Sequence, residues 1–64
     1  MATFRVQYTD NTDKKNPQKK VVLVSEEELA YLLHAIREQK EYYALDWVQK
    51  AKHGKWIDVT KMYQ

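Results

Sequence analysis

The sequence predicts a small α+β domain: a three-stranded antiparallel-type sheet in β-β-α-β order, covered on one face by a long or kinked helix. Three observations support this fold class. Apolar and polar side chains alternate over residues 3–9, a helix-capping pattern begins at Ser25, and residues 55–63 are rich in β-branched and aromatic residues. The chain has 64 residues, the size of one small domain, so we expect residues 1–64 to form a single globular unit.

Side-chain patterns predict the first two strands. Every second residue from Phe4 to Tyr8 is apolar and the residues between them are polar, as in a half-buried strand. The polar stretch that follows contains the only proline and predicts a loop. Residues 19–24 predict a second strand. Because the run Val21–Val24 is apolar at successive positions, we expect both faces of this strand to be at least partly covered.

The first turn of the helix is the clearest local signal. Ser25 stands at the N-cap and Glu28 three residues later, the capping-box arrangement in which each side chain accepts the backbone N–H of the other residue. Val24 and Leu29 occupy the positions of a hydrophobic staple around that cap. The helix is therefore expected to begin at Glu26. Its buried stripe has helical spacing: Leu29, Leu32, Leu33 and Ile36.

Residues 43–52 fit two interpretations, of which a helix is the preferred one. Four apolar residues repeat the i, i+3, i+4, i+7 spacing of a buried helical stripe: Ala44, Trp47, Val48 and Ala51. Gly54 stands where a glycine commonly ends a helix. This pattern favours a second helix, or a kinked continuation of the first, that ends near Lys52.

The alternative is a fourth strand. Residues 43–51 would then be extended and His53-Gly54 would form a tight turn, which gives a β-β-α-β-β order. Pairing across that turn puts Lys50 opposite Ile57. Because this pairing leaves neither face cleanly apolar or polar, the helix is preferred.

Composition and motifs argue against an enzyme. Without cysteine the chain has no disulfide, no thiolate nucleophile and no cysteine zinc site, and its one glycine cannot build a phosphate-binding loop. The only serine, Ser25, is explained by the helix cap. His34 and Glu38 form an i, i+4 pair, but a zinc site needs further ligands. We therefore expect no enzymatic activity, no metal and no cofactor.

The sequence also predicts a cytoplasmic protein. No apolar run approaches the roughly 20 residues that span a membrane, and the N-terminal residues lack the apolar segment of a secretory signal.

Aromatic residues in the second half of the chain predict a protein-binding surface. One helix cannot cover all five of these aromatic residues in so small a core: Tyr31, Tyr42, Tyr43, Trp47 and Trp56. Trp and Tyr left at a surface are the residue types most enriched at protein interfaces. The residues assigned to this surface are Tyr42, Tyr43, Trp47 and Trp56.

The leading hypothesis is therefore a small non-enzymatic protein-binding module. Its partner is a protein of unknown identity, with a homo-oligomer as one option. The small size suggests an accessory or inhibitor protein of a phage or mobile element.

Lysines provide an alternative function, the binding of nucleic acid. The net charge is +2, and basic residues gather in the segments 14–20 and 50–55. If these segments lie together, they could hold phosphates beside the stacking surface of Trp56. The absence of arginine from both segments weakens this alternative, because arginine is favoured for bidentate phosphate contacts. The residues concerned are Lys14, Lys15, Lys19, Lys20, Lys50, Lys52 and Lys55.

Overall fold

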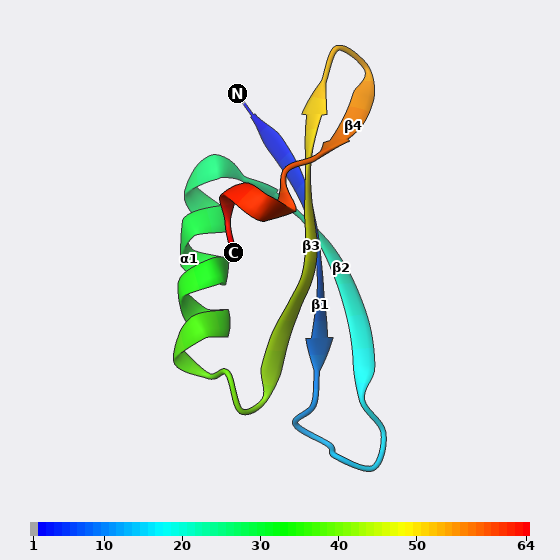
Figure 1. Cartoon of the computed structure of the whole chain (residues 1–64), viewed down its shortest axis with the longest axis vertical. Coiled ribbons are helices and arrows are strands. Elements are labelled where there is room, and N and C mark those ends of the chain that lie inside the picture. Colours follow the sequence, from blue (N-terminus) through cyan, green and yellow to red (C-terminus); the bar gives the residue numbers. More distant parts are fainter. Residues whose placement is uncertain (1) are drawn as a thin grey trace.

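A four-stranded antiparallel sheet with one helix on one face is the architecture of the computed structural model, which describes residues 2–64. The elements along the chain are β1 (Thr3–Asp10), β2 (Gln18–Ser25), α1 (Glu26–Glu38), β3 (Tyr43–Lys52), β4 (Lys55–Asp58) and the short 3-10 helix η1 (Thr60–Met62). The strand order in the sheet is β2-β1-β3-β4. Helix α1 lies along one face, and the β1–β2 loop and the β3–β4 hairpin lie at opposite ends of the molecule (Figure 1).

The three-stranded prediction is wrong, because the segment Tyr43–Lys52 is a strand and not a helix. β1 is a central strand, in which Val6 lies opposite Val22 of β2 on one side and Val48 of β3 on the other. Val6 and Val48 are both fully buried. Pairing with β3 satisfies the hydrogen-bonding groups on the second edge of β1 and buries Val48. This stabilisation outweighs the preference of the segment for a helix, because such local preferences are weak. The four-stranded alternative is the arrangement observed.

A β-bulge explains why the residues of β3 do not alternate. Trp47 and Leu45 lie opposite the neighbouring residues Gln7 and Tyr8, so Asp46 is an extra residue without a partner on β1. Because of the bulge, the Leu45 side chain lies on the same face of the sheet as helix α1. The next buried side chain of the strand, Val48, comes three positions later. A spacing of three is also what a helix shows, and the period-two pattern of a strand is lost.

The turn between β3 and β4 lies at His53 and Gly54, whose φ angles are 52° and 76°. Positive φ at both central positions is what a two-residue type I′ turn requires, so Gly54 serves a hairpin and not a helix end. Beyond the turn, Lys50 does lie opposite Ile57. The pair is tolerated because β4 is an exposed edge strand and because the Lys50 ammonium lies 5.9 Å from the centre of the Phe4 ring.

The strand predicted over residues 55–63 is too long. β4 ends at Asp58, and the chain then turns into η1. The backbone N–H and the hydroxyl of Thr60 both donate to Asp58 Oδ1, at 2.9 and 2.5 Å, which fixes this turn. Tyr63 then returns to the core, with its ring edge-on to Phe4 at a centroid distance of 6.1 Å.

Helix α1 begins as predicted. The Ser25 hydroxyl accepts the N–H of Glu28 at 3.3 Å, and the Glu28 carboxylate accepts the N–H of Ser25 at 3.1 Å, which completes the capping box. Across residues 2–64, no helix is both long and apolar enough to cross a membrane. The buried side chains come from α1 and the sheet: Phe4, Val6, Leu29, Leu33, Ile36 and Val48.

Candidate protein-binding face

Among residues 2–64, no helix lies on the sheet face opposite α1, which we call the open face (Figure 1). Strand pairing places these side chains on it: Arg5, Gln7, Thr9, Val21, Leu23, Trp47, Gln49 and Trp56. Val21 and Leu23 are 52% and 66% exposed, so this face of β2 is covered only in part. Clustered apolar side chains on an uncovered sheet face are typical of an interaction surface.

A guanidinium between two indoles forms the centre of the open face. Arg5 Cζ lies 4.4 Å from the centre of the Trp56 ring and 5.7 Å from that of Trp47. Arg5 also donates from Nε and from one terminal nitrogen to Gln49 Oε1, at 2.9 and 2.5 Å. The register explains this cluster, because Arg5 lies opposite Gln49 and the next strand brings Trp56 to the same face. Stacking and hydrogen bonding together hold the guanidinium in one orientation.

The bulge residue Asp46 organises the neighbouring part of the open face. Its Oδ2 accepts hydrogen bonds from the Thr9 hydroxyl at 2.9 Å and from the Gln7 amide at 3.3 Å, and the Lys19 ammonium lies 3.3 Å from the same atom. Partial burial raises the pKa of the Asp46 carboxyl, but the three donors lower it by more, so the pKa lies below its ordinary value. Asp46 is therefore a fixed negative charge beside the indole of Trp47.

The structure brings together two of the four predicted aromatic residues. Trp47 and Trp56 share the open face around Arg5. Tyr43 lies on the opposite side of the sheet, where its ring meets that of Tyr8 at a centroid distance of 6.0 Å. Tyr42 lies in the turn before β3 and is partly exposed.

Sequence reasoning missed three contributors to the open face: Arg5, Val21 and Leu23. The alternation of β1 groups Arg5 with the polar side chains on the face opposite the core, but it assigns Arg5 no role. The signal that could have found Val21 and Leu23 was the same alternation in β2, combined with a single helix that can cover only one face.

The seven lysines of the alternative function are not brought together. Lys14 and Lys15 lie in the β1–β2 loop, whereas Lys52 and Lys55 flank the β3–β4 turn, at the other end of a molecule 40 Å long (Figure 1). Lys19 pairs with Asp46 of β3 and Lys20 with Asp10 of β1, and Lys50 lies over an aromatic ring. The condition for a shared phosphate-binding surface is therefore not met.

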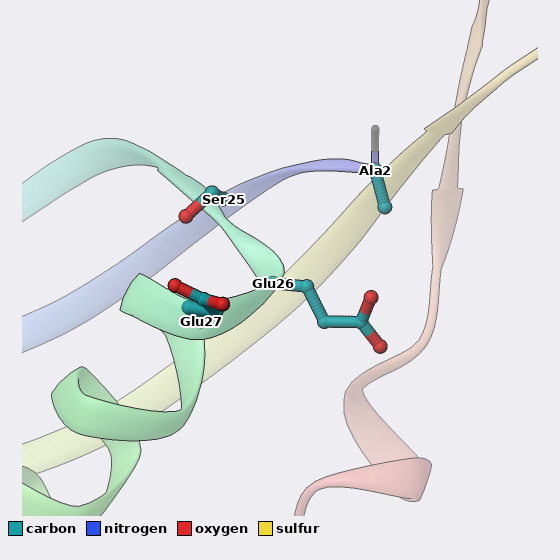
Figure 2. Close-up of a pocket in the computed structure, with 4 residues that line it drawn as sticks. All are labelled: Ala2, Ser25, Glu26 and Glu27. Atoms are coloured by element: carbon teal, nitrogen blue, oxygen red, sulfur yellow. The ribbon is translucent and has the colours of Figure 1, made fainter.

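The start of α1 contains a shallow pocket lined by Ala2, Ser25, Glu26 and Glu27 (Figure 2). The hydroxyl of Ser25 is engaged in the capping box, and the lining offers no basic side chain that could activate it. Hydrogen bonds from the backbone and side chain of Ser25 lower the pKa of Glu28, so the helix start carries its own negative charge. A negatively charged helix start is not a binding site for an anion such as phosphate.

His34 and Glu38 form the surface pair that their spacing predicts. The His34 Nε2 lies 3.8 Å from the Glu38 carboxylate, and both side chains are exposed on the outer side of α1. In the part of the chain that the structure describes, residues 2–64, no group of three or more His, Asp or Glu side chains is placed to hold a metal ion.

Comparisons with protein families, with curated proteins and with solved structures find no match to this chain.

Proposed function

We propose that the chain is a non-enzymatic protein-binding module whose contact surface is the open face. The observation that supports this most directly is the Trp47–Arg5–Trp56 cluster on a sheet face that no helix covers. Trp and Arg are the residue types that most often dominate the binding energy of protein interfaces. The revised contact surface therefore keeps Trp47 and Trp56 and adds Arg5.

The cluster is suited to binding because it is ordered before a partner arrives. Two N–H donors of Arg5 bond to Gln49, and its other N–H donors remain for carbonyl or carboxylate groups of a partner. Its stacked geometry means that little side-chain entropy is lost on binding. Exposed Val21 and Leu23 extend the surface with apolar area on the neighbouring strand.

Identifying the partner would show which biological role this binding serves. An accessory or inhibitor protein of a phage or mobile element would act through such a contact surface, and the captured partner would show whether this chain does. Nucleic acid is the competing ligand, and the experiment below separates the two.

Affinity capture from a nuclease-treated lysate, with the wild-type chain and two variants as bait, tests the proposal. Trp56→Ala removes a partly exposed side chain from an edge strand, so we expect the fold to be retained and binding of the partner to be weakened. We expect the partner's Kd to rise roughly thirtyfold, which corresponds to about 2 kcal/mol. Tyr31→Ala is the matched control, since Tyr31 is 77% exposed on the helix side, and it should capture the same partner as the wild type.

Tryptophan fluorescence gives an independent readout, because both tryptophans of the chain lie on the open face. A partner that covers this face shifts the emission to shorter wavelength on titration. Equal capture by wild type and Trp56→Ala, with no change in emission, would refute the proposal. A partner that disappears after nuclease treatment would also refute it, in favour of nucleic acid.

A further inference from the structure

The outer edge of β2 is the long free edge of the sheet. β2 pairs only with β1, and within residues 2–64 no strand pairs with its other side. Half of the strand is the uncharged run Val21–Val24, and two of those side chains are more than half exposed. An extended, apolar edge with unpaired N–H and C=O groups is a template for pairing with another strand.

The opposite edge of the sheet is much shorter than the β2 edge. β4 has only four residues, and the chain after it turns back onto β3. The Val59 N–H donates to the Val48 carbonyl at 2.9 Å, and the Val48 N–H donates to the Thr60 hydroxyl at 2.9 Å. These bonds occupy the backbone groups of β3 where β4 ends, so the free edge on this side is limited to the four residues of β4. The eight-residue edge of β2 is therefore the better template for strand addition.

Charge along β2 selects the direction of pairing. Lys19 and Lys20 are the second and third residues of the strand, and the three glutamates of the first turn of α1 follow its end immediately. Glu26 and Glu27 are exposed, and their side chains project from the helix start (Figure 2). Two copies of this edge that run antiparallel bring the positive end of each next to the negative end of the other. A parallel arrangement would place like charges together.

We propose that the protein forms a two-fold symmetric homodimer by antiparallel pairing of β2 with β2 of a second copy, in the register that places Val22 opposite Val22. In this register Val21 lies opposite Leu23 of the other copy on the open face, and Lys19 lies opposite Ser25, beside the glutamates. The result is a continuous eight-stranded sheet with both helices on one side. The two open faces become one surface, but the pairing itself is independent of the function proposed above.

Mass measured by light scattering or sedimentation over a concentration series tests for the dimer. We expect the apparent mass to rise from 7.7 kDa to twice that value as the concentration increases from about 1 μM to about 1 mM, the range of transient interfaces. Leu23→Lys puts a charge at the centre of the paired edge and should raise the dissociation constant at least tenfold. Tyr31→Lys, at an equally exposed helix position, and Trp56→Ala, on the open face, should leave it unchanged.

The register is tested by a single cysteine, because the chain has none of its own. Opposed residues of antiparallel strands have Cα atoms about 4.5–5.5 Å apart, which is within disulfide reach. Val22→Cys should therefore oxidise readily to a covalent dimer that keeps the wild-type circular dichroism spectrum, and Tyr31→Cys should not. A monomer at every concentration would overturn the proposal, as would a dimer that tolerates Leu23→Lys and is not cross-linked through position 22.

Discussion

The guanidinium of Arg5 contacts the indole rings of both Trp47 and Trp56 on the open face. In the sequence Arg5 is one polar member of an alternating strand, and nothing marks it apart from its neighbours. In the structure it lies at the centre of the open face, because Trp47 and Trp56, both more than forty positions away in the sequence, place their rings against it. Its role could not be predicted from the alternation, since that pattern gives the face of a residue but not its neighbours on other strands.

Replacing Arg5 by lysine tests this role at the level of one side chain. Lysine keeps the charge but cannot stack as a plane or form both hydrogen bonds to Gln49 with fixed geometry. We expect Arg5→Lys to lower the free energy of unfolding by about 1 kcal/mol in urea titrations. The control is Arg37→Lys, since Arg37 is exposed on α1 and makes one hydrogen bond, to the Tyr63 carbonyl. Equal losses for both variants would mean that stacking at Arg5 contributes nothing.

At the scale of the elements, the sequence predicts those that depend on neighbouring residues but not the strand that depends on a distant partner. The cap at Ser25, the stripe of α1 and the alternation of β1 are determined within a few residues of sequence, and all three are confirmed. β3 depends on a partner strand far away in the sequence and is further disguised by the bulge at Asp46. Periodicity within the sequence contains no information on this pairing or on the bulge. It therefore favours a helix for this segment, and the fourth strand appears only as the alternative.

The β3–β4 turn gives a prediction at this scale. His53 has a positive φ, a conformation that asparagine adopts more readily than histidine, and Asn-Gly is a preferred type I′ pair. We expect His53→Asn to raise the free energy of unfolding by about 0.5 kcal/mol, measured by thermal or urea denaturation. Gly54→Ala should lower it by about 1 kcal/mol through backbone strain alone, because the space around a Cβ at this position is open. No change in either variant would show that the turn is not held in this conformation.

On the scale of the whole molecule, carboxylates make the fold sensitive to acid. The pKa of Asp10 is lowered from 3.8 to about 2 by hydrogen bonds from the side chain and backbone of Thr12, with a further contribution from Lys20. The pKa of Asp58 is lowered by its bonds from Thr60. Because these pKa values are lower in the folded than in the unfolded chain, their stabilisation is complete above about pH 5 and is lost as the pH falls toward 2.

Urea unfolding at several pH values checks this sensitivity. The free energy of unfolding of the wild type should fall between pH 5 and about pH 2. Asp10→Asn resembles the protonated form of the side chain, so it should be less stable than the wild type at pH 6, and the difference should narrow toward pH 2. A difference that stays constant with pH would contradict the assigned role of the Asp10 charge.

The order of the strands has a consequence for synthesis on the ribosome. β1 is made first but lies in the interior of the sheet, between β2 and β3. β2 and α1 can join it as soon as they emerge, yet its other edge stays bare until the segment to Lys52 has left the exit tunnel. The nascent chain therefore passes through a stage in which a finished hairpin and helix expose the unpaired side of Val6. An unpaired strand edge of this kind can pair with the edges of other unfinished chains.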